Sequence, residues 1–244
     1  MKYMALFQAV ILVFLVVFAS DSGAETYIVE KVTEDCRLQQ KNGQNSLKLA
    51  GIIIPEENKK EACALIDKII APKNEVTAKT GYKWLDRHGY ILAQIYNKKD
   101  FWVQGELLKN GLALAYPTPD NDIAAEEMFK AEKLAINAKK GYWKNNNIYQ
   151  AISLKNNYKQ HVSQFLVVVG TVYEVNMRRD KVYINFEKDW KNDFSLLINK
   201  DNFRAFKKMQ LTDLKGKKIM VRGWLEDYNG PMIEVRSPLE IRIF

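Results

Sequence analysis

The hydrophobic pattern of the chain changes along its length, and these changes limit the folds that it can adopt. Residues 27–96 contain short apolar runs typical of β-strands, separated by turn sequences such as Asn42 followed by Gly43. A helix is expected after Pro55, and residues 103–140 place apolar side chains at the spacing of two further helices. The pattern predicts an α+β domain with a small β-sheet core.

Beyond residue 164 the apolar and polar residues alternate strictly, as they do in half-buried strands. Four further strand-like runs follow, and a short helical segment at 202–208 lies between the third and fourth strands. Five strands with this helix position are the order of an OB-type barrel. Residues 146–164, rich in Asn and Lys, predict a linker that can contain some helix, so the expected domains are 25–145 and 165–244.

The first 24 residues have the features of a secretory signal peptide. Lys2 precedes an apolar run from Ala5 to Ala19, and small residues lead to Ala24. The alternative is an uncleaved anchor, but the run is shorter than the about 20 residues that span a bilayer. We therefore expect cleavage after Ala24, a periplasmic or secreted protein, and no integral membrane segment in the mature chain.

Charge and cysteine content narrow the classes of partner and site. The formal net charge of +8 favours polyanions such as nucleic acid or anionic envelope surfaces, although it is modest for this length. In an oxidising compartment, Cys36 and Cys63 predict one disulfide, with two buried free thiols as the alternative. The two histidines, His88 and His161, are not spaced like metal ligands.

Several short motifs in the first domain occur together in a fixed order. They are Leu49 to Ile52 followed by Pro55 and Glu56, then Asp86 to Gly89, Glu106 to Ala113, and Lys140 to Trp143. In this order and spacing they resemble the staphylococcal-nuclease-like (thermonuclease) family across residues 27–143. The resemblance implies a five-stranded OB barrel with three helices. Residues 182–186, 221–224 and 229–235 resemble a C-terminal segment found behind such domains in some Gram-negative proteins, and this leaves the role of the second domain open.

The resemblance also implies a set of site residues. Members of the family bind calcium through carboxylates, orient the attacking water with a glutamate and hold the phosphate with two arginines. Asp35 falls at the first metal-ligating aspartate and Glu56 at the catalytic glutamate. Lys48 and Tyr90 stand where the two arginines belong, and Ile53 stands where the second metal-binding aspartate belongs.

These replacements predict a degenerate active site. Lys48 lacks the bidentate fork of an arginine, and Ile53 removes an anionic ligand from a calcium site. Arg87 is close enough in sequence to substitute for an arginine, but its turn position favours another direction. Calcium is expected only if activity survives, and no other cofactor is implied. The alternative for Asp35 and Glu56 is that they are ordinary turn residues.

A binding module is therefore the favoured function, with a metal-dependent nuclease of altered catalytic residues as the alternative. OB barrels bind single strands by stacking bases on aromatic side chains beside a basic groove. The candidate contacts are Lys48, Lys83, Arg87, Tyr90 and Tyr116 in the first domain, and Trp190, Lys191, Arg222 and Trp224 in the second. Core packing is the alternative for each aromatic residue. An envelope protein is the other candidate partner, because fold does not determine function.

Overall fold

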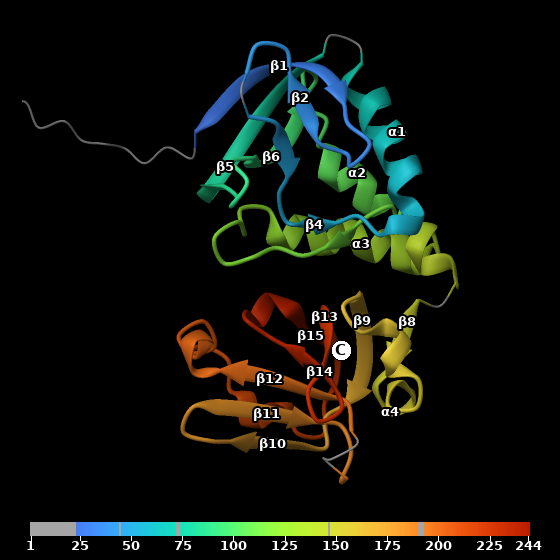
Figure 1. Cartoon of the computed structure of the whole chain (residues 1–244), viewed down its shortest axis with the longest axis vertical. Coiled ribbons are helices and arrows are strands. Elements are labelled where there is room, and N and C mark those ends of the chain that lie inside the picture. Colours follow the sequence, from blue (N-terminus) through green and yellow to red (C-terminus); the bar gives the residue numbers. More distant parts are fainter. Residues whose placement is uncertain (1–22, 44, 72–73, 146, 190–192) are drawn as a thin grey trace, which may run out of the picture.

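The chain forms two barrel-like domains, one above the other in Figure 1. The computed structural model describes residues 23–43, 45–71, 74–145, 147–189 and 193–244. Across these residues every helix is too short or too polar to span a membrane. The predicted signal peptide lies almost wholly outside the described residues.

The first domain is a closed barrel in the order β1-β2-β3-β6-β5, as the family resemblance implied. Its strands are β1 (Ala24–Val32), β2 (Leu38–Gln40), β3 (Leu47–Leu49), β5 (Glu75–Leu85) and β6 (Ile91–Asn97). Strands β3 and β6 run parallel, and the other neighbours are antiparallel. Because side chains alternate along a strand, Leu47 and Leu49 enter the core while Lys48 faces outward.

Three helices pack around this barrel, and the last of them lies between it and the second domain (Figure 1). They are α1 (Lys59–Ile70), α2 (Val103–Lys109) and α3 (Ala125–Asn137). Helix α1 buries Ala62, Ile66 and Ile69, which share one face at helical spacing. After α2 the chain requires a glycine, because Gly111 has a φ of +67° and an added Cβ would lie 2.2 Å from the Lys140 carbonyl oxygen.

Two very short strands extend the first domain towards the second. They are β4 (Ile52–Ile53) and β7 (Leu114–Ala115), which form an antiparallel pair. Short 3₁₀ turns follow at Glu56–Asn58, before α1, and at Gly141–Asn145, after α3. The chain then enters the second domain.

The second domain is one sheet in the order β10-β11-β12-β14-β13-β9-β8, with β15 also paired to β13. Its strands are β8 (Ile148–Gln150), β9 (Phe165–Thr171), β10 (Glu174–Met177), β11 (Lys181–Asn185), β12 (Ser195–Asn199), β13 (Lys218–Asp227), β14 (Pro231–Glu234) and β15 (Ile241–Ile243). Only Val172 and Tyr173 separate β9 from β10, so one bent segment pairs with β13 at one end and with β11 at the other. If that segment is counted as the first strand of the second sheet, with β8 left out, its third and fifth strands, β12 and β14, are parallel, as β3 and β6 are in the first barrel.

The structure differs from the sequence expectation in two segments of the second domain. Within 146–164, expected as a linker, β8 pairs with β9, and helix α4 (Ala151–Leu154) buries two of its side chains in the second core. Ala151 and Leu154 supply apolar contacts that the surrounding Asn and Lys residues obscured. At 202–208 the expected helix is replaced by turns, flanked by 3₁₀ turns at Lys200–Asn202 and Leu211–Leu214.

The two domains share a buried apolar cluster. Leu114, Ala135, Tyr142 and Trp143 come from the first domain, and Val167, Val169 and Met220 come from the second. At the same interface Arg222 on β13 forms two hydrogen bonds of 2.9 Å with Glu132 on α3. Both side chains are at most 2% exposed. The interface therefore resembles a small core rather than a flexible contact.

Candidate functional site

The residues at the family's catalytic positions gather at one end of the first barrel. The loop after β1, strands β3 and β4, and the turn before β6 border a cavity of about 240 Å³. Asp35, Lys48, Ile53 and Tyr90 all line it. Glu56 lies beside an adjoining cavity between the domains, of about 520 Å³, which Ile53 also lines. The structure thus brings together four of the five positions and places the fifth next to them.

Asp35 is held by its neighbours. The Thr33 hydroxyl donates to Oδ1 at 2.6 Å, and Arg37 Nε lies 2.5 Å from Oδ2. Partial burial acts to raise the pKa of Asp35, but these hydrogen bonds and the charge of Arg37 outweigh it and lower the pKa below its usual value. The carboxylate stays ionised, and its oxygens are already engaged by protein donors.

Arg37, which the sequence analysis did not single out, also lines this cavity and lies between Asp35 and Tyr90. Its guanidinium lies 4.2 Å from the centroid of the Tyr90 ring, a cation–π contact, while it also pairs with Asp35. The charge-assisted hydrogen bond to Asp35 raises the pKa of Arg37. Its position two residues after Asp35 on a tight loop was the only signal in the sequence.

Two further residues at the family's catalytic positions, Lys48 and Glu56, also have ionic partners. Lys48 Nζ lies 3.3 Å from Asp86 Oδ2, and Glu56 pairs with Lys59 across one turn. Asp86 in addition accepts backbone hydrogen bonds from His88 and from residue 90, which builds the turn before β6. Burial acts to raise the pKa of Asp86, but these bonds and Lys48 lower it.

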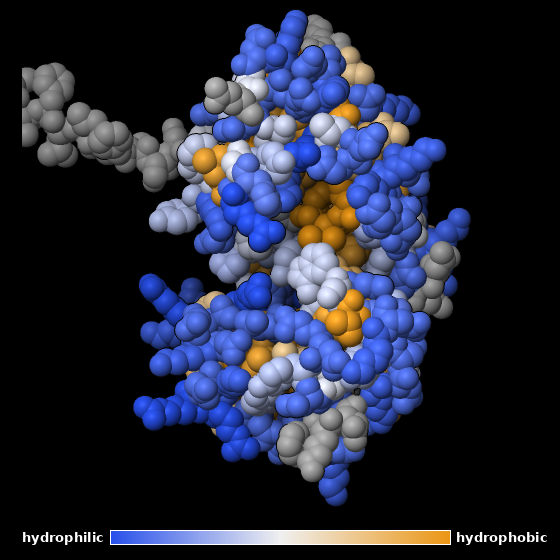
Figure 2. Space-filling view, viewed as in Figure 1, coloured by the Kyte–Doolittle hydropathy of each residue, from blue (hydrophilic) through white to orange (hydrophobic). Residues whose placement is uncertain are grey.

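The floor of the cavity is apolar where a calcium site needs oxygen. Ile52, Ile53 and Ile54 line it, and Figure 2 shows an apolar hollow over β4 with hydrophilic side chains around it. Ca²⁺ takes six to eight oxygen ligands. Among the described residues, no group of three or more His, Cys, Asp or Glu side chains is placed to hold a metal ion. The side chains present therefore do not fit a calcium ion.

The disulfide predicted between Cys36 and Cys63 is confirmed, with an S–S distance of 2.05 Å. It connects the loop that carries Asp35 and Arg37 to helix α1. Cys36 adopts a φ of 61°, in the left-handed region. The cavity wall is thus covalently attached to the helix beside it.

Two exposed aromatic residues near Lys83 were missed by the sequence analysis. Strand β5 pairs with β6 at residues 76–80 and again at Leu85, so residues 81–84 form no register pairs with β6. There Tyr82 is 94% exposed and Trp84 is 52% exposed, and Lys83 lies between them. Aromatic residues two positions apart around a lysine were the available signal. This basic aromatic strip, residues 82–84, precedes the Asp86 turn directly.

Arg87 does not replace the missing arginine. Its Nε donates to His88 Nε2 at 3.0 Å, and it is not among the side chains that line the cavity. Tyr116 is also directed elsewhere, because its hydroxyl donates to Glu240 at 3.3 Å and its ring meets Phe165 edge-on. Burial raises the pKa of Tyr116, and the residue belongs to the domain interface.

The candidate contacts of the second domain have different positions. The prediction that Arg222 contacts nucleic acid is wrong. Its side chain is 1% exposed and paired with Glu132, so a ligand in solvent does not reach it. Alternation along β13 places Arg222 opposite the barrel core, but the first domain covers that face. Trp224 is 48% exposed and contacts Phe165 edge-on. Trp190 and Lys191 lie outside the described residues.

A comparison with models of known protein families gives a match for the first domain. Residues 46–145 match the family model described as staphylococcal nuclease homologue. No curated protein matches the chain. The closed five-stranded barrel, its three helices and this match together show that the first domain of the chain is a staphylococcal-nuclease-like domain.

Proposed function

We propose that this protein is exported and that its nuclease-like domain binds single-stranded nucleic acid without cutting it efficiently. The observation that carries the proposal is the state of the catalytic positions. Asp35, Lys48 and Glu56 are each paired with another side chain. Ile53 contributes apolar surface to the cavity that Asp35 and Lys48 line. Calcium is not part of the proposed function.

The two arginines that the family uses, replaced here by Lys48 and Tyr90, are needed for the cleavage step more than for binding. Phosphodiester cleavage needs fixed donors aimed at the charge that develops in the transition state. Arginines in that role contribute about 10³–10⁵-fold in rate in other phosphoryl-transfer enzymes. Lys48 lies against Asp86, and Tyr90 lies against Arg37, so neither offers a free cationic fork.

Binding needs features that the domain retains. The net charge of +8 belongs to the whole chain and favours a polyanion, and in the nuclease-like domain Tyr82 and Trp84 present exposed rings on both sides of Lys83. Base stacking on such rings does not depend on a metal ion. Export is supported by the sequence of the first 24 residues and by the Cys36–Cys63 disulfide, which is favoured in oxidising compartments.

Binding and cleavage of a fluorescein-labelled single-stranded DNA test the proposal, in calcium and in chelator. We expect binding that weakens as salt rises, with the oligonucleotide left intact in both buffers. Replacing both exposed rings, Tyr82→Ala with Trp84→Ala, is expected to weaken binding by about tenfold or more. Tyr173→Ala, an exposed tyrosine of the second domain, is the matched control.

The alternative, a metal-dependent nuclease, makes the opposite prediction in the same assay. Cleavage that requires calcium and disappears in Glu56→Ala would establish it and refute the degenerate site. If neither binding nor cleavage occurs with well-folded protein, the nucleic-acid proposal fails and a protein partner becomes the better explanation.

A further inference from the structure

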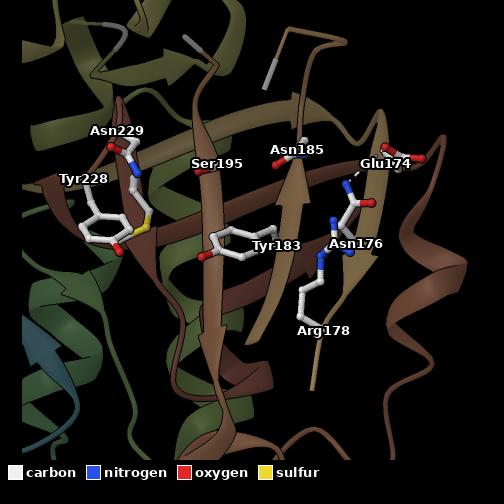
Figure 3. A pocket seen from close by; sticks show the side chains of 9 residues that line it. Glu174, Asn176, Arg178, Tyr183, Asn185, Ser195, Tyr228 and Asn229 are labelled. Carbon is white, nitrogen blue, oxygen red and sulfur yellow. Dashed lines mark hydrogen bonds between the residues drawn. The ribbon is translucent and has the colours of Figure 1, made fainter. Parts of the chain in front are cut away.

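The second domain carries a hollow of its own, on the outer side of its sheet and away from the nuclease-like site. Its volume is about 370 Å³, and strands β10, β11, β12 and β14 form its floor (Figure 3). Nothing in the family match concerns this part of the chain, since the match ends at residue 145.

The strand register explains why polar side chains line the floor. Glu174 pairs with Asn185, Asn185 with Ser195, and Ser195 with Met232, which makes one row across four strands. Directly paired residues point to the same side of a sheet. The neighbouring residues Ile184 and Leu196 point to the other side, into the core. The row therefore lies on the outer face.

Two tyrosines dominate this face. Tyr183, which pairs with Asn176, extends across the middle of the hollow, and Tyr228 on the turn between β13 and β14 stands at its side (Figure 3). Tyr228 is 51% exposed. Asn185 and Asn229 add amide groups around the rings. Flat rings beside amide donors and acceptors are suited to planar heterocycles that also form hydrogen bonds.

Cations gather at the end of the hollow where β10 turns into β11. Arg178 lines the cavity, Arg179 follows it, and Lys181 Nζ lies 5.6 Å from the centroid of the Tyr228 ring. The backbone N–H of Lys200 donates to the backbone carbonyl oxygen of Asp180, so a fourth cationic residue lies beside this turn, in which Asp180 is the one acidic residue. In Figure 2 this end of the second domain is covered by strongly hydrophilic side chains.

The charges are arranged unevenly across the hollow. Glu174 lies on the edge strand β10 and accepts a hydrogen bond of 3.1 Å from Asn176. A phosphate backbone would be repelled there and attracted to the turn with Arg178 and Arg179. The hollow thus has an aromatic centre and one cationic border, the two parts that single-strand binding requires.

We propose that this hollow binds single-stranded nucleic acid. Bases stack on Tyr183 and Tyr228, and the backbone follows Arg178, Arg179 and Lys181. The second and third strands of OB barrels and the adjoining loops commonly bind oligonucleotides or oligosaccharides. The cationic border favours the nucleotide here, because a neutral sugar gains nothing from it. This proposal concerns the second domain and does not depend on binding by the first.

The test is fluorescence anisotropy of the full-length protein with a labelled oligothymidylate of about 15 nucleotides. We expect Tyr183→Ala and Tyr228→Ala each to raise Kd by about tenfold. Arg178→Ala is expected to reduce the slope of log K against log salt by about one unit. Tyr173→Ala on the same domain, outside the hollow, should leave Kd unchanged. Thermal unfolding of each variant shows that it is folded.

The outcomes separate this proposal from the one for the first domain. If Kd rises only in Tyr82→Ala with Trp84→Ala, the present inference is overturned and the first proposal stands. If Kd rises only in Tyr183→Ala and Tyr228→Ala, the present inference stands and binding by the first domain is overturned. A neutral chito-oligosaccharide that changes the fluorescence of the wild type but not of Tyr228→Ala, with no binding of oligothymidylate, would also overturn the inference.

Discussion

At the scale of single residues, Asp193 is a buried carboxylate with an unusual environment. It is 2% exposed, and Oδ2 accepts backbone hydrogen bonds of 2.8 Å from Phe186 and Glu187. Burial raises the pKa of Asp193 to about 6, and the nearby Glu187 charge adds to the effect, while the two hydrogen bonds partly offset it. The folded state therefore prefers the protonated acid over a wider pH range than the unfolded chain does.

This preference predicts a pH dependence of stability. The stability contributed by Asp193 is fully present below about pH 4 and is lost as pH rises through about 6, because ionisation then penalises the folded state. Asp193→Asn keeps the hydrogen-bond acceptor but cannot ionise. Between pH 4 and 7 we expect its free energy of unfolding to rise relative to wild type by about 2–3 kcal/mol.

Urea unfolding at both pH values measures this difference. Asp201→Asn, at an exposed aspartate of the same domain, is the control and should show no such change. A difference between Asp193→Asn and wild type that stays constant with pH would contradict the assignment of a raised pKa.

At the scale of elements, the disulfide determines how a loop and a helix are held together. Cys36 belongs to the loop between β1 and β2, Cys63 belongs to α1, and their sequence separation is 27. The loop-closure model gives a stabilisation of about 3–4 kcal/mol for a ring of this size. Asp35 and Arg37, which flank Cys36, lie on the loop that this bond attaches to α1.

Reduction of this bond is expected to lower the free energy of unfolding by about 2–4 kcal/mol. Urea unfolding with and without a phosphine reductant checks the value. The double variant Cys36→Ala with Cys63→Ala should be as unstable as the reduced protein and insensitive to reductant. Equal stability of the oxidised and reduced wild type would count against the structural role of the disulfide.

At the scale of the whole molecule, the Glu132–Arg222 pair joins the two domains. Glu132 Oε1 also accepts from the backbone N–H of Ala115, and Arg222 donates to the Ala115 carbonyl oxygen. The pair thus connects α3, β7 and β13 in a site without solvent access. Removing one member of a buried ion pair leaves an uncompensated charge, which is more costly than losing both.

Arg222→Met is therefore expected to lower the free energy of unfolding by about 3–5 kcal/mol. The double variant Glu132→Gln with Arg222→Met should recover much of this loss, because no charge is then left buried. Glu126→Gln, on the exposed side of the same helix, is the control and should change stability by about 0.5 kcal/mol or less. Chemical unfolding measures all three, and a loss for Arg222→Met as small as the control's would show that the pair is unimportant.

The sequence alone predicted the fold class, the first barrel and the disulfide, and its motifs assigned residues to the catalytic positions. Period-two and helical patterns located most strands and helices, and family motifs predicted the first barrel and the replaced residues Lys48, Ile53 and Tyr90. The pairing of Cys36 with Cys63 was predictable because only one pairing exists. These features depend on local spacing or on residue identity, both of which a sequence displays directly.

Tertiary structure decided which faces are covered and which charges meet. Periodicity shows that Arg222 points away from its own barrel, but not that another domain covers that side. It cannot show that Arg37 lines the nuclease-like cavity beside Tyr90, or that Tyr183 and Tyr228 line one hollow. Such contacts join residues that chain folding brings together from different elements. Their burial and pairing follow from packing in three dimensions and not from the order of residues along the chain.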